Sequence, residues 1–266
     1  MKQTPERILK LLPKLSLMSN NFMKCCLEDN IPAVELILRI IMNKPDLVVK
    51  TLSIQHNLPE LLTHEAYLDV YAVDSQNKHY NIEVQRSPED ANDTRARYYS
   101  SMLVTHLTPK GLKKIDRLPE TWVIFIVGND IIGKGDAIYN LESYFYTNDG
   151  SRVPFDDNTH IAYVNATYRG DDELGKLMSD FNEPDFNKIN FPILAETVRH
   201  IKENQKGVSK VCKYEEEFAN DFANDVLIDH LIDLINTGLL KFDELKASGK
   251  YSALQIAQIE AGLAKN

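Results

Sequence analysis

The chain has 266 residues, 43% hydrophobic and 26% charged, a composition that allows one folded core with an appended segment. Its net charge of −9 counts against a nonspecific polyanion binder, so any contact with nucleic acid must rest on a local basic surface. Three cysteines without metal-ligand spacing, and no apolar run of the roughly 20 residues that a membrane span needs, favour a cytoplasmic protein without membrane contact.

The first half of the chain alternates between helical and strand-like patterns. Residues 31–43 place Pro32 where a first helical turn tolerates proline, and their apolar residues then recur at helical spacing, which predicts a packed helix. Runs rich in β-branched and aromatic residues predict consecutive strands over 47–55, 65–74 and 78–86. A helix over 94–107 and a strand buried on both faces over 121–128 follow.

The second half begins with further strand-like pieces over 141–168 and becomes helical over 171–205. Residues 213–266 hold five basic and ten acidic residues, and their apolar residues are spaced for amphipathic helices. Such helices repel DNA but suit packing against the core or a second subunit. We therefore expect these helices to mediate self-association into a homo-oligomer or contact with a partner. We therefore expect a main domain over 1–210 and an acidic helical tail over 211–266.

The strands around Asp69 and Glu83 carry the candidate chemistry. If they pair as an antiparallel hairpin with its turn centred on Gln76, Asp69 and Glu83 face each other about 5 Å apart. Strand alternation places Gln85 on the side of Glu83, and Ile82 and Val84 on the opposite, core side. Two facing carboxylates destabilise a sheet unless a cation neutralises them, which predicts a Mg²⁺ site for phosphodiester chemistry. The alternative is a hairpin that presents both acids to water.

A resemblance to a known family favours the metal site. Asp69 followed by Glu83-Val84-Gln85 resembles the D-x(n)-(D/E)-x-(K/Q) motif of PD-(D/E)xK nucleases. The blocks NNFMKCCLEDNIPAVELILRII, YLDVYAVDSQNKHYNIEVQR, RARYYSSML and LPETWVIFI resemble PD-(D/E)xK family transposases, or recombination-promoting nucleases, over roughly residues 15–210. The resemblance implies a restriction-endonuclease-like α/β core with a mixed central sheet flanked by helices, and a DNA endonuclease dependent on Mg²⁺ or Mn²⁺ with a role in recombination or mobile elements.

By the same resemblance, Asp69 and Glu83 match the metal-binding acids, and Gln85 stands where many relatives have lysine. Gln85 can orient water or phosphate but supplies no positive charge. Glu35 is a further candidate metal ligand in the first core helix, and its alternative is an i,i+4 ion pair with Arg39. The family's opening block has an aspartate where this chain has Asn20-Asn21, which implies either weaker metal binding or only a changed helix cap.

The best basic segment near this site is 86–117, with seven basic and four acidic residues. An arginine here can hold a DNA phosphate bidentately, and a tyrosine can add a hydrogen bond or a stacking face. The alternative is ordinary solvated charge on a helix. The candidate DNA-binding residues are Arg86, Arg95, Arg97 and Tyr98.

The sequence also suggests two functions other than a nuclease. Residues 128–135 match G-x4-G-K, but Gly135 stands where a P-loop needs Ser or Thr for Mg²⁺, so we expect no nucleotide cofactor. The second rival is a noncatalytic nucleic-acid- or protein-binding module on the same fold. Metal-dependent nicking of DNA separates that module from a nuclease.

Overall fold

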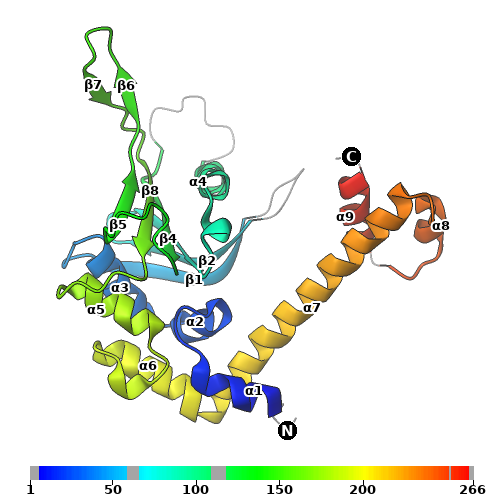
Figure 1. Cartoon of the computed structure of the whole chain (residues 1–266), viewed down its shortest axis with the longest axis horizontal. Helices are drawn as coiled ribbons and strands as arrows, with labels where there is room; N and C mark the ends of the chain where they lie inside the picture. Colours follow the sequence, from blue (N-terminus) through cyan, green and yellow to red (C-terminus); the bar gives the residue numbers. More distant parts are fainter. Residues whose placement is uncertain (1–5, 59–65, 109–117, 252, 264–266) are drawn as a thin grey trace. The chain divides into compact units, whose positions relative to one another are not determined.

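The computed structural model describes residues 6–58, 66–108, 118–251 and 253–263 (Figure 1). The chain divides into two compact units, Met1–Val211 and Cys212–Asn266. A long helix, α7 (Gln205–Asn236), begins in the first unit and continues into the second. Within the described residues, no helix is long and apolar enough to span a membrane.

The first unit contains the sheet and most of the shorter helices. Its helices are α1 (Glu6–Leu11), α2 (Asn20–Leu27), α3 (Ile31–Ile41), α4 (Asp93–Leu107), α5 (Glu173–Asn182) and α6 (Pro192–Glu203), with 3-10 turns η1 (Leu12–Lys14), η2 (Pro88–Ala91) and η3 (Phe186–Lys188). Its strands are β1 (Val49–Leu58), β2 (Ala66–Asp74), β3 (His79–Gln85), β4 (Thr121–Val127), β5 (Ile138–Leu141), β6 (Tyr144–Tyr146), β7 (Arg152–Pro154) and β8 (Thr159–Asn165).

Six of the described strands form a mixed sheet in the order β1-β2-β3-β4-β8-β5. The β1-β2-β3 meander is antiparallel, β3, β4 and β8 run parallel, and β5 returns antiparallel to β8. A parallel pair needs a crossover, and α4 supplies the one between β3 and β4. This is the α/β architecture with a mixed sheet and flanking helices that the sequence predicts.

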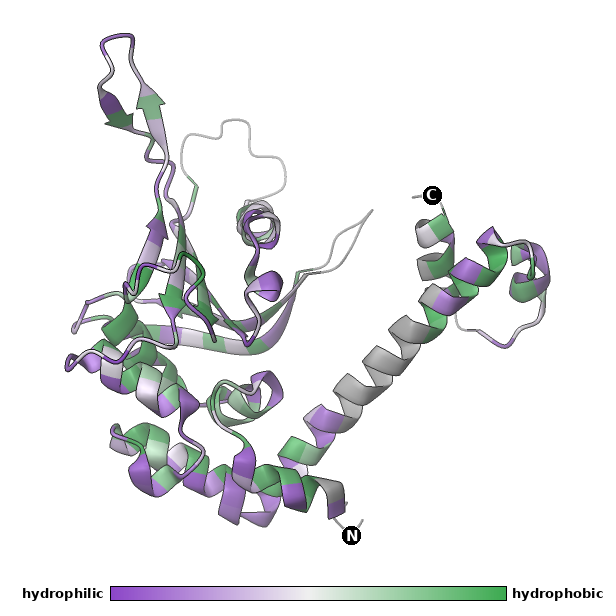
Figure 2. Ribbon diagram, viewed as in Figure 1, coloured by the Kyte–Doolittle hydropathy of each residue, from purple (hydrophilic) through white to green (hydrophobic). Residues whose placement is uncertain are grey.

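One face of the sheet packs against α4. Phe125 stacks on Tyr163 of the neighbouring strand with ring centroids 5.4 Å apart, and both contact the buried side of α4. In register, Glu83 pairs with Phe125. Because paired residues share a face of a sheet, Glu83 lies on this covered face. Figure 2 shows hydrophobic residues both in the strands and in the helices beside them.

The opposite face packs against α2 and α3, and α5 and α6 pack on those helices in turn (Figure 1). Ile82 and Val84 are buried on this side, as predicted, but every residue of β3 is buried. The side of β3 that carries Glu83 and Gln85 is therefore covered as well. Its neighbours β2 and β4 close both of its edges, and helices close both of its faces.

A buried carboxylate ties two of the covering helices together. Asp180 of α5 is fully buried and accepts hydrogen bonds from the backbone N–H groups of Asn190 (2.7 Å) and Phe191 (2.9 Å). Phe191 is the N-cap residue of α6, so Asp180 accepts hydrogen bonds from backbone N–H groups at the start of α6 that have no partner within the helix. The negative charge also lies at the positive end of the helix dipole.

The predicted strand pieces in 141–168 belong to two different sheets. β8 enters the main sheet, whereas β6 pairs with β7 as a separate antiparallel hairpin. This hairpin extends away from the main sheet (Figure 1), and Figure 2 shows hydrophobic residues on both of its strands. Phe145, Tyr146 and Val153 are all exposed.

In the second unit, α7 is followed by α8 (Phe242–Ala247) and α9 (Ala253–Leu263). Ile228, Leu231, Leu245 and Ile259 form a small core of their own. Gly238 and Gly249 follow α7 and α8 with φ of 75° and 65°, a left-handed conformation that glycine adopts without a Cβ penalty. Both glycines therefore allow the chain to turn away after a helix ends.

Candidate active site

The β2–β3 hairpin brings Asp69 and Glu83 together. Its paired residues run from Val73↔His79 to Val70↔Ile82, which is the register with the turn centred on Gln76. At the next position the Asp69 backbone N–H donates to Glu83 Oε1 at 3.1 Å. The two acids are therefore adjacent as predicted, but the contact runs from a backbone to a side chain rather than between two regularly paired residues.

Both acids are withdrawn from solvent. Glu83 is 0% exposed and Asp69 is 7% exposed. The alternative in which the hairpin presents these carboxylates to water is therefore wrong, because α4 and α2 cover the hairpin. Burying a carboxylate is costly unless hydrogen bonds and opposite charges compensate it, so the partners of each acid decide what the site can do.

Three side chains contact the Glu83 carboxylate. Asn81 Nδ2 donates to Oε1 at 3.1 Å, and Gln85 Nε2 donates to Oε2 at 3.3 Å. The nearest Arg95 guanidinium nitrogen lies 3.9 Å from Oε2. Even so, burial and the charge of Asp69 raise the pKa of Glu83 well above its ordinary value. The folded chain therefore favours a proton or a further cation on Glu83.

Both oxygens of Asp69 are held by α2. Asn20 Nδ2 donates to Oδ2 at 3.0 Å, and Lys24 Nζ lies 2.7 Å from Oδ1. Asn20 and Lys24 are four residues apart, so they share one face of the helix. Ser19, not Asn20, is the N-cap residue of α2. The interpretation of Asn20 as a helix cap is therefore wrong, and its side chain instead lies inside the site.

Two amide oxygens in this cluster are buried without a hydrogen-bond partner, Asn20 Oδ1 and Asn81 Oδ1. Each amide is oriented by its own N–H group, which donates to a carboxylate. An unsatisfied buried acceptor costs free energy, and an amide oxygen is a hard ligand that suits Mg²⁺ or Mn²⁺. The polar run Asn81, Glu83, Gln85 alternates along one strand face, and this pattern was available from the sequence but was not used for Asn81.

Glu35 is engaged elsewhere. Its Oε1 lies 2.6 Å from the Arg39 guanidinium, and its Oε2 accepts a 2.9 Å hydrogen bond from the Val49 backbone N–H. Oε1 thus makes the i,i+4 ion pair of the alternative within α3, and Oε2 joins α3 to the start of β1. We do not include Glu35 among the proposed metal ligands.

Arg86 also has structural partners. It follows β3 directly and donates to the Met18 carbonyl at 3.0 Å and to the Ser19 hydroxyl. These bonds hold the entry of α2 against the end of the strand that carries Gln85. The arrangement positions Asn20 and Lys24 on α2. The predicted contact of Arg86 with DNA stays a prediction.

α4 presents the other candidate DNA-binding residues. Arg95 is fixed by a 3.0 Å hydrogen bond to the Tyr99 hydroxyl and lies over that ring, 5.3 Å from its centroid. Its side chain is 37% exposed, so it joins the buried acids to the surface. Arg97 and Tyr98 are exposed on the same helix. The remaining basic residues of the predicted segment lie outside the described residues: Lys110, Lys113, Lys114 and Arg117.

The glycine-rich loop is organised around its own carboxylate. Asp130 accepts hydrogen bonds from the backbone N–H groups of Gly133 (2.8 Å) and Gly135 (2.6 Å) and from the Tyr139 hydroxyl (2.7 Å). In a P-loop such N–H groups cradle a phosphate. Here an acidic side chain takes that place, so the loop is shaped against nucleotide binding.

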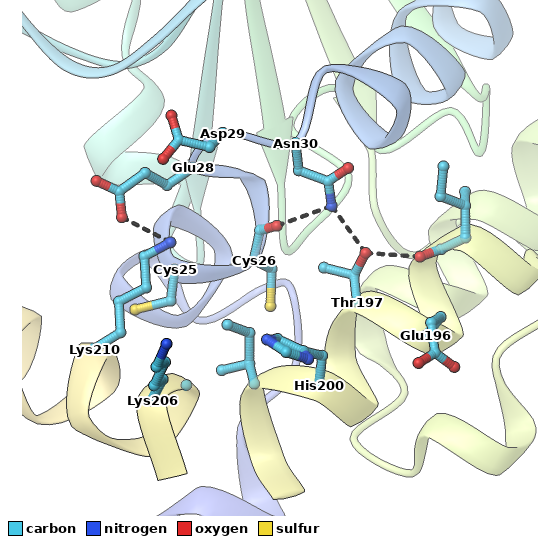
Figure 3. Close-up of a pocket in the computed structure, with 13 residues that line it drawn as sticks. Cys25, Cys26, Glu28, Asp29, Asn30, Glu196, Thr197, His200, Lys206 and Lys210 are labelled. Atoms are coloured by element: carbon cyan, nitrogen blue, oxygen red, sulfur yellow. Dashed lines mark hydrogen bonds and ion pairs between the residues drawn. The ribbon is translucent and has the colours of Figure 1, made fainter. Parts of the chain in front are cut away.

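A surface pocket of about 530 Å³ lies apart from the acids, between α2, α6 and the start of α7 (Figure 3). The Asn30 amide donates to the Cys26 carbonyl (3.2 Å) and the Thr197 hydroxyl (2.9 Å), and Lys210 is paired with Glu28 at 2.7 Å. These groups already satisfy one another. None of the buried side-chain atoms that lack a hydrogen-bond partner in the described residues belongs to a residue lining this pocket.

A mixed sheet between helices, with two buried acids on adjacent strands next to a Glu-x-Gln motif, defines a restriction-endonuclease-like fold. The family described as PD-(D/E)XK nuclease family transposase matches residues 34–168, about half of the chain. The chain belongs to this family. Comparison with curated proteins and with solved structures gives no significant match.

Proposed function

We propose that the protein is a DNA endonuclease dependent on Mg²⁺ or Mn²⁺, with a role in recombination or mobile-element biology. The observation that carries the proposal is the pair of adjacent, buried carboxylates of Asp69 and Glu83, the two acids that resemble the nuclease motif. Membership of a nuclease-type transposase family supports DNA as the substrate.

The donor set of the cluster suits a divalent cation of this kind. Within the described residues, no group of three or more His, Cys, Asp and Glu side chains is arranged to hold a metal. Two carboxylates with neutral oxygens, completed by water and substrate phosphate, are typical of Mg²⁺ in phosphodiester chemistry. Asp69 and Glu83 would hold the ion, and Asn20 and Asn81 carry unsatisfied oxygens beside them. When bound, such an ion lowers the pKa of a bound water and neutralises phosphate charge.

Other side chains of the site would orient the attacking water and bind the DNA phosphates. Gln85, held against Glu83 at 3.3 Å, would orient the attacking water or a phosphate oxygen, since its amide can donate and accept. Arg95 is partly exposed beside Glu83, so it would hold a DNA phosphate close to the acids. Arg97 and Tyr98 would extend this contact along α4, because both are exposed on that helix.

Isosteric variants test the proposal. Wild type, Asp69→Asn and Glu83→Gln are incubated with supercoiled and linear DNA in Mg²⁺ or Mn²⁺, with and without EDTA. We expect cleavage by wild type alone, and a loss of about 10³-fold or more in each variant, because each removes a negative charge that the ion requires. Glu196→Gln, an exposed carboxylate of α6, is the matched control and should cleave like wild type. Cleavage that persists in EDTA or in both acid variants would refute the mechanism.

A noncatalytic nucleic-acid-binding module is the second candidate. It is favoured by Asn20 and Gln85, which are neutral where relatives carry charge, and by the ion pair that Lys24 already makes with Asp69. Binding of labelled duplex DNA in Ca²⁺ and in EDTA separates the two candidates. Tight binding that is unaffected by the metal, with no cleavage in any divalent ion, would favour the module.

A further inference from the structure

Lys24 is the most deeply buried cation in contact with the two acids. It lies on α2 and is 8% exposed, with Nζ 2.7 Å from Asp69 Oδ1. The rest of that helix is apolar on its buried sides, including Phe22, Met23 and Cys26. Lysine is rarely buried unless it is paired, so the ammonium group of Lys24 is held in the site by its ion pair with Asp69.

A purely structural role accounts poorly for this ion pair. Burying a lysine and an aspartate costs the desolvation of both charges, and a hydrophobic pair of similar size often stabilises a fold as well. The partner of Lys24 is also not an arbitrary acid, because Asp69 is the residue that the motif resemblance assigns to metal binding. Lys24 thus brings a positive charge into the site, whereas Gln85, at the motif position where many relatives have lysine, is neutral.

The second cation at the site, Arg95, is held more rigidly than Lys24. The Arg95 guanidinium is fixed by Tyr99 through a hydrogen bond and a ring contact, and it is 3.9 Å from Glu83. Lysine instead carries a compact charge on a flexible four-carbon stem, which can move between neighbouring anions without refolding. A divalent ion at Asp69 would repel a positive charge 2.7 Å from Oδ1 strongly, since the interior screens charges weakly.

We propose that Lys24 is the phosphate-binding catalytic cation of the site, which neutralises Asp69 in the free protein and moves to the scissile phosphate when metal and DNA bind. This inference rests on the proposed nuclease function. It assigns to α2 the charge that lysine supplies from β3 in relatives with the (D/E)-x-K motif. It also explains how a site with Gln85 retains one mobile positive charge.

The proposal predicts effects of opposite sign on metal binding and on cleavage. Lys24→Met removes a competing cation, so Mn²⁺ alone should bind at least about tenfold more tightly in calorimetric titration. The same variant should cleave DNA about 10²- to 10³-fold more slowly in single turnover at saturating Mn²⁺, because phosphate charge is less well neutralised. Lys24→Arg should retain part of the rate. Adding Gln85→Lys to Lys24→Met should restore part of the lost rate from the adjacent strand.

Lys78→Met is the matched control, because Lys78 also forms a 2.7 Å ion pair with a partly buried acid, Glu120, apart from the site. It should change neither Mn²⁺ affinity nor the cleavage rate, and its thermal unfolding reports the cost of losing such a pair. If Lys24→Met stays folded and cleaves like wild type, or binds Mn²⁺ no more tightly, the inference is wrong while the proposed function stands. If wild type itself does not cleave, both fail.

Discussion

Replacing the Glu83 carboxylate by an amide should stabilise the metal-free protein while abolishing metal binding. Glu83→Gln keeps the shape of the side chain and an oxygen for the Asp69 N–H and Asn81 donors. The Gln85 amide can turn over to accept from the new NH₂ group. What the substitution removes is a charge that is fully buried and close to Asp69.

The magnitude follows from the partners of Glu83. Two like charges on neighbouring side chains repel by about 2 to 4 kcal/mol at an effective dielectric constant of about 20, and Lys24 offsets part of the Asp69 charge. The attraction of Arg95 offsets only part of this, because its guanidinium is 3.9 Å away and its side chain is 37% exposed, so solvent screens it. We expect Glu83→Gln to raise the free energy of unfolding by about 1 to 3 kcal/mol, or roughly 2 to 8 °C in a chain of this size.

The direction of the pH dependence is set by the raised pKa of Glu83. Between its ordinary pKa and the raised folded value, the folded chain holds a proton that the unfolded chain releases, so stability falls as pH rises through this window. Below the ordinary pKa both states are protonated and the effect vanishes. The difference in melting temperature between Glu83→Gln and wild type should therefore be near zero at pH 4 and should grow with pH.

The assay is thermal unfolding in EDTA from pH 4 to 8, repeated at pH 8 with Mn²⁺. Wild type should gain stability with Mn²⁺, because a ligand that binds only the folded state stabilises it, and Glu83→Gln should not. Glu196→Gln, an exposed acid paired with Arg199, should differ from wild type by less than about 0.5 kcal/mol at every pH. A Glu83→Gln variant that is less stable than wild type at pH 8, with the same pH profile, would refute the reasoning.

Three further predictions concern other parts of the chain. Arg95→Ala should weaken DNA binding and lower the slope of affinity against salt by about one, measured by fluorescence anisotropy at several salt concentrations, and an unchanged slope would exclude a phosphate contact. The protein should neither hydrolyse nor require ATP, because Asp130 occupies the loop N–H groups, and ATP turnover lost specifically in Lys134→Ala would contradict this. Deletion of the proposed tail, 213–266, should reduce self-association in sedimentation without weakening DNA binding, and the reverse result would make the tail a DNA reader.

The part of the site that lies within the β2–β3 hairpin could be predicted from the spacing of residues along the sequence. Strand alternation and a turn centred on Gln76 suffice to bring Asp69 beside Glu83 and to place Gln85 on the same side, since the side-chain period of a strand is two. The burial of both acids could not be predicted in this way. It depends on α4 and α2 closing over the hairpin, and an alternating strand pattern does not say whether its polar face is covered.

By itself, the sequence determined the α/β class, the order of the main elements, the hairpin register and the resemblance to the nuclease family, because each depends on periodicity, turn residues or motif spacing along the chain. Only the tertiary structure decided which distant residues complete the site. Asn20 and Lys24 reach Asp69 across 49 and 45 positions of sequence, while Glu35 is drawn away to Arg39 and Val49. The physical reason is that α2 docks on the sheet through its apolar residues, and this packing then fixes where its polar i,i+4 face points.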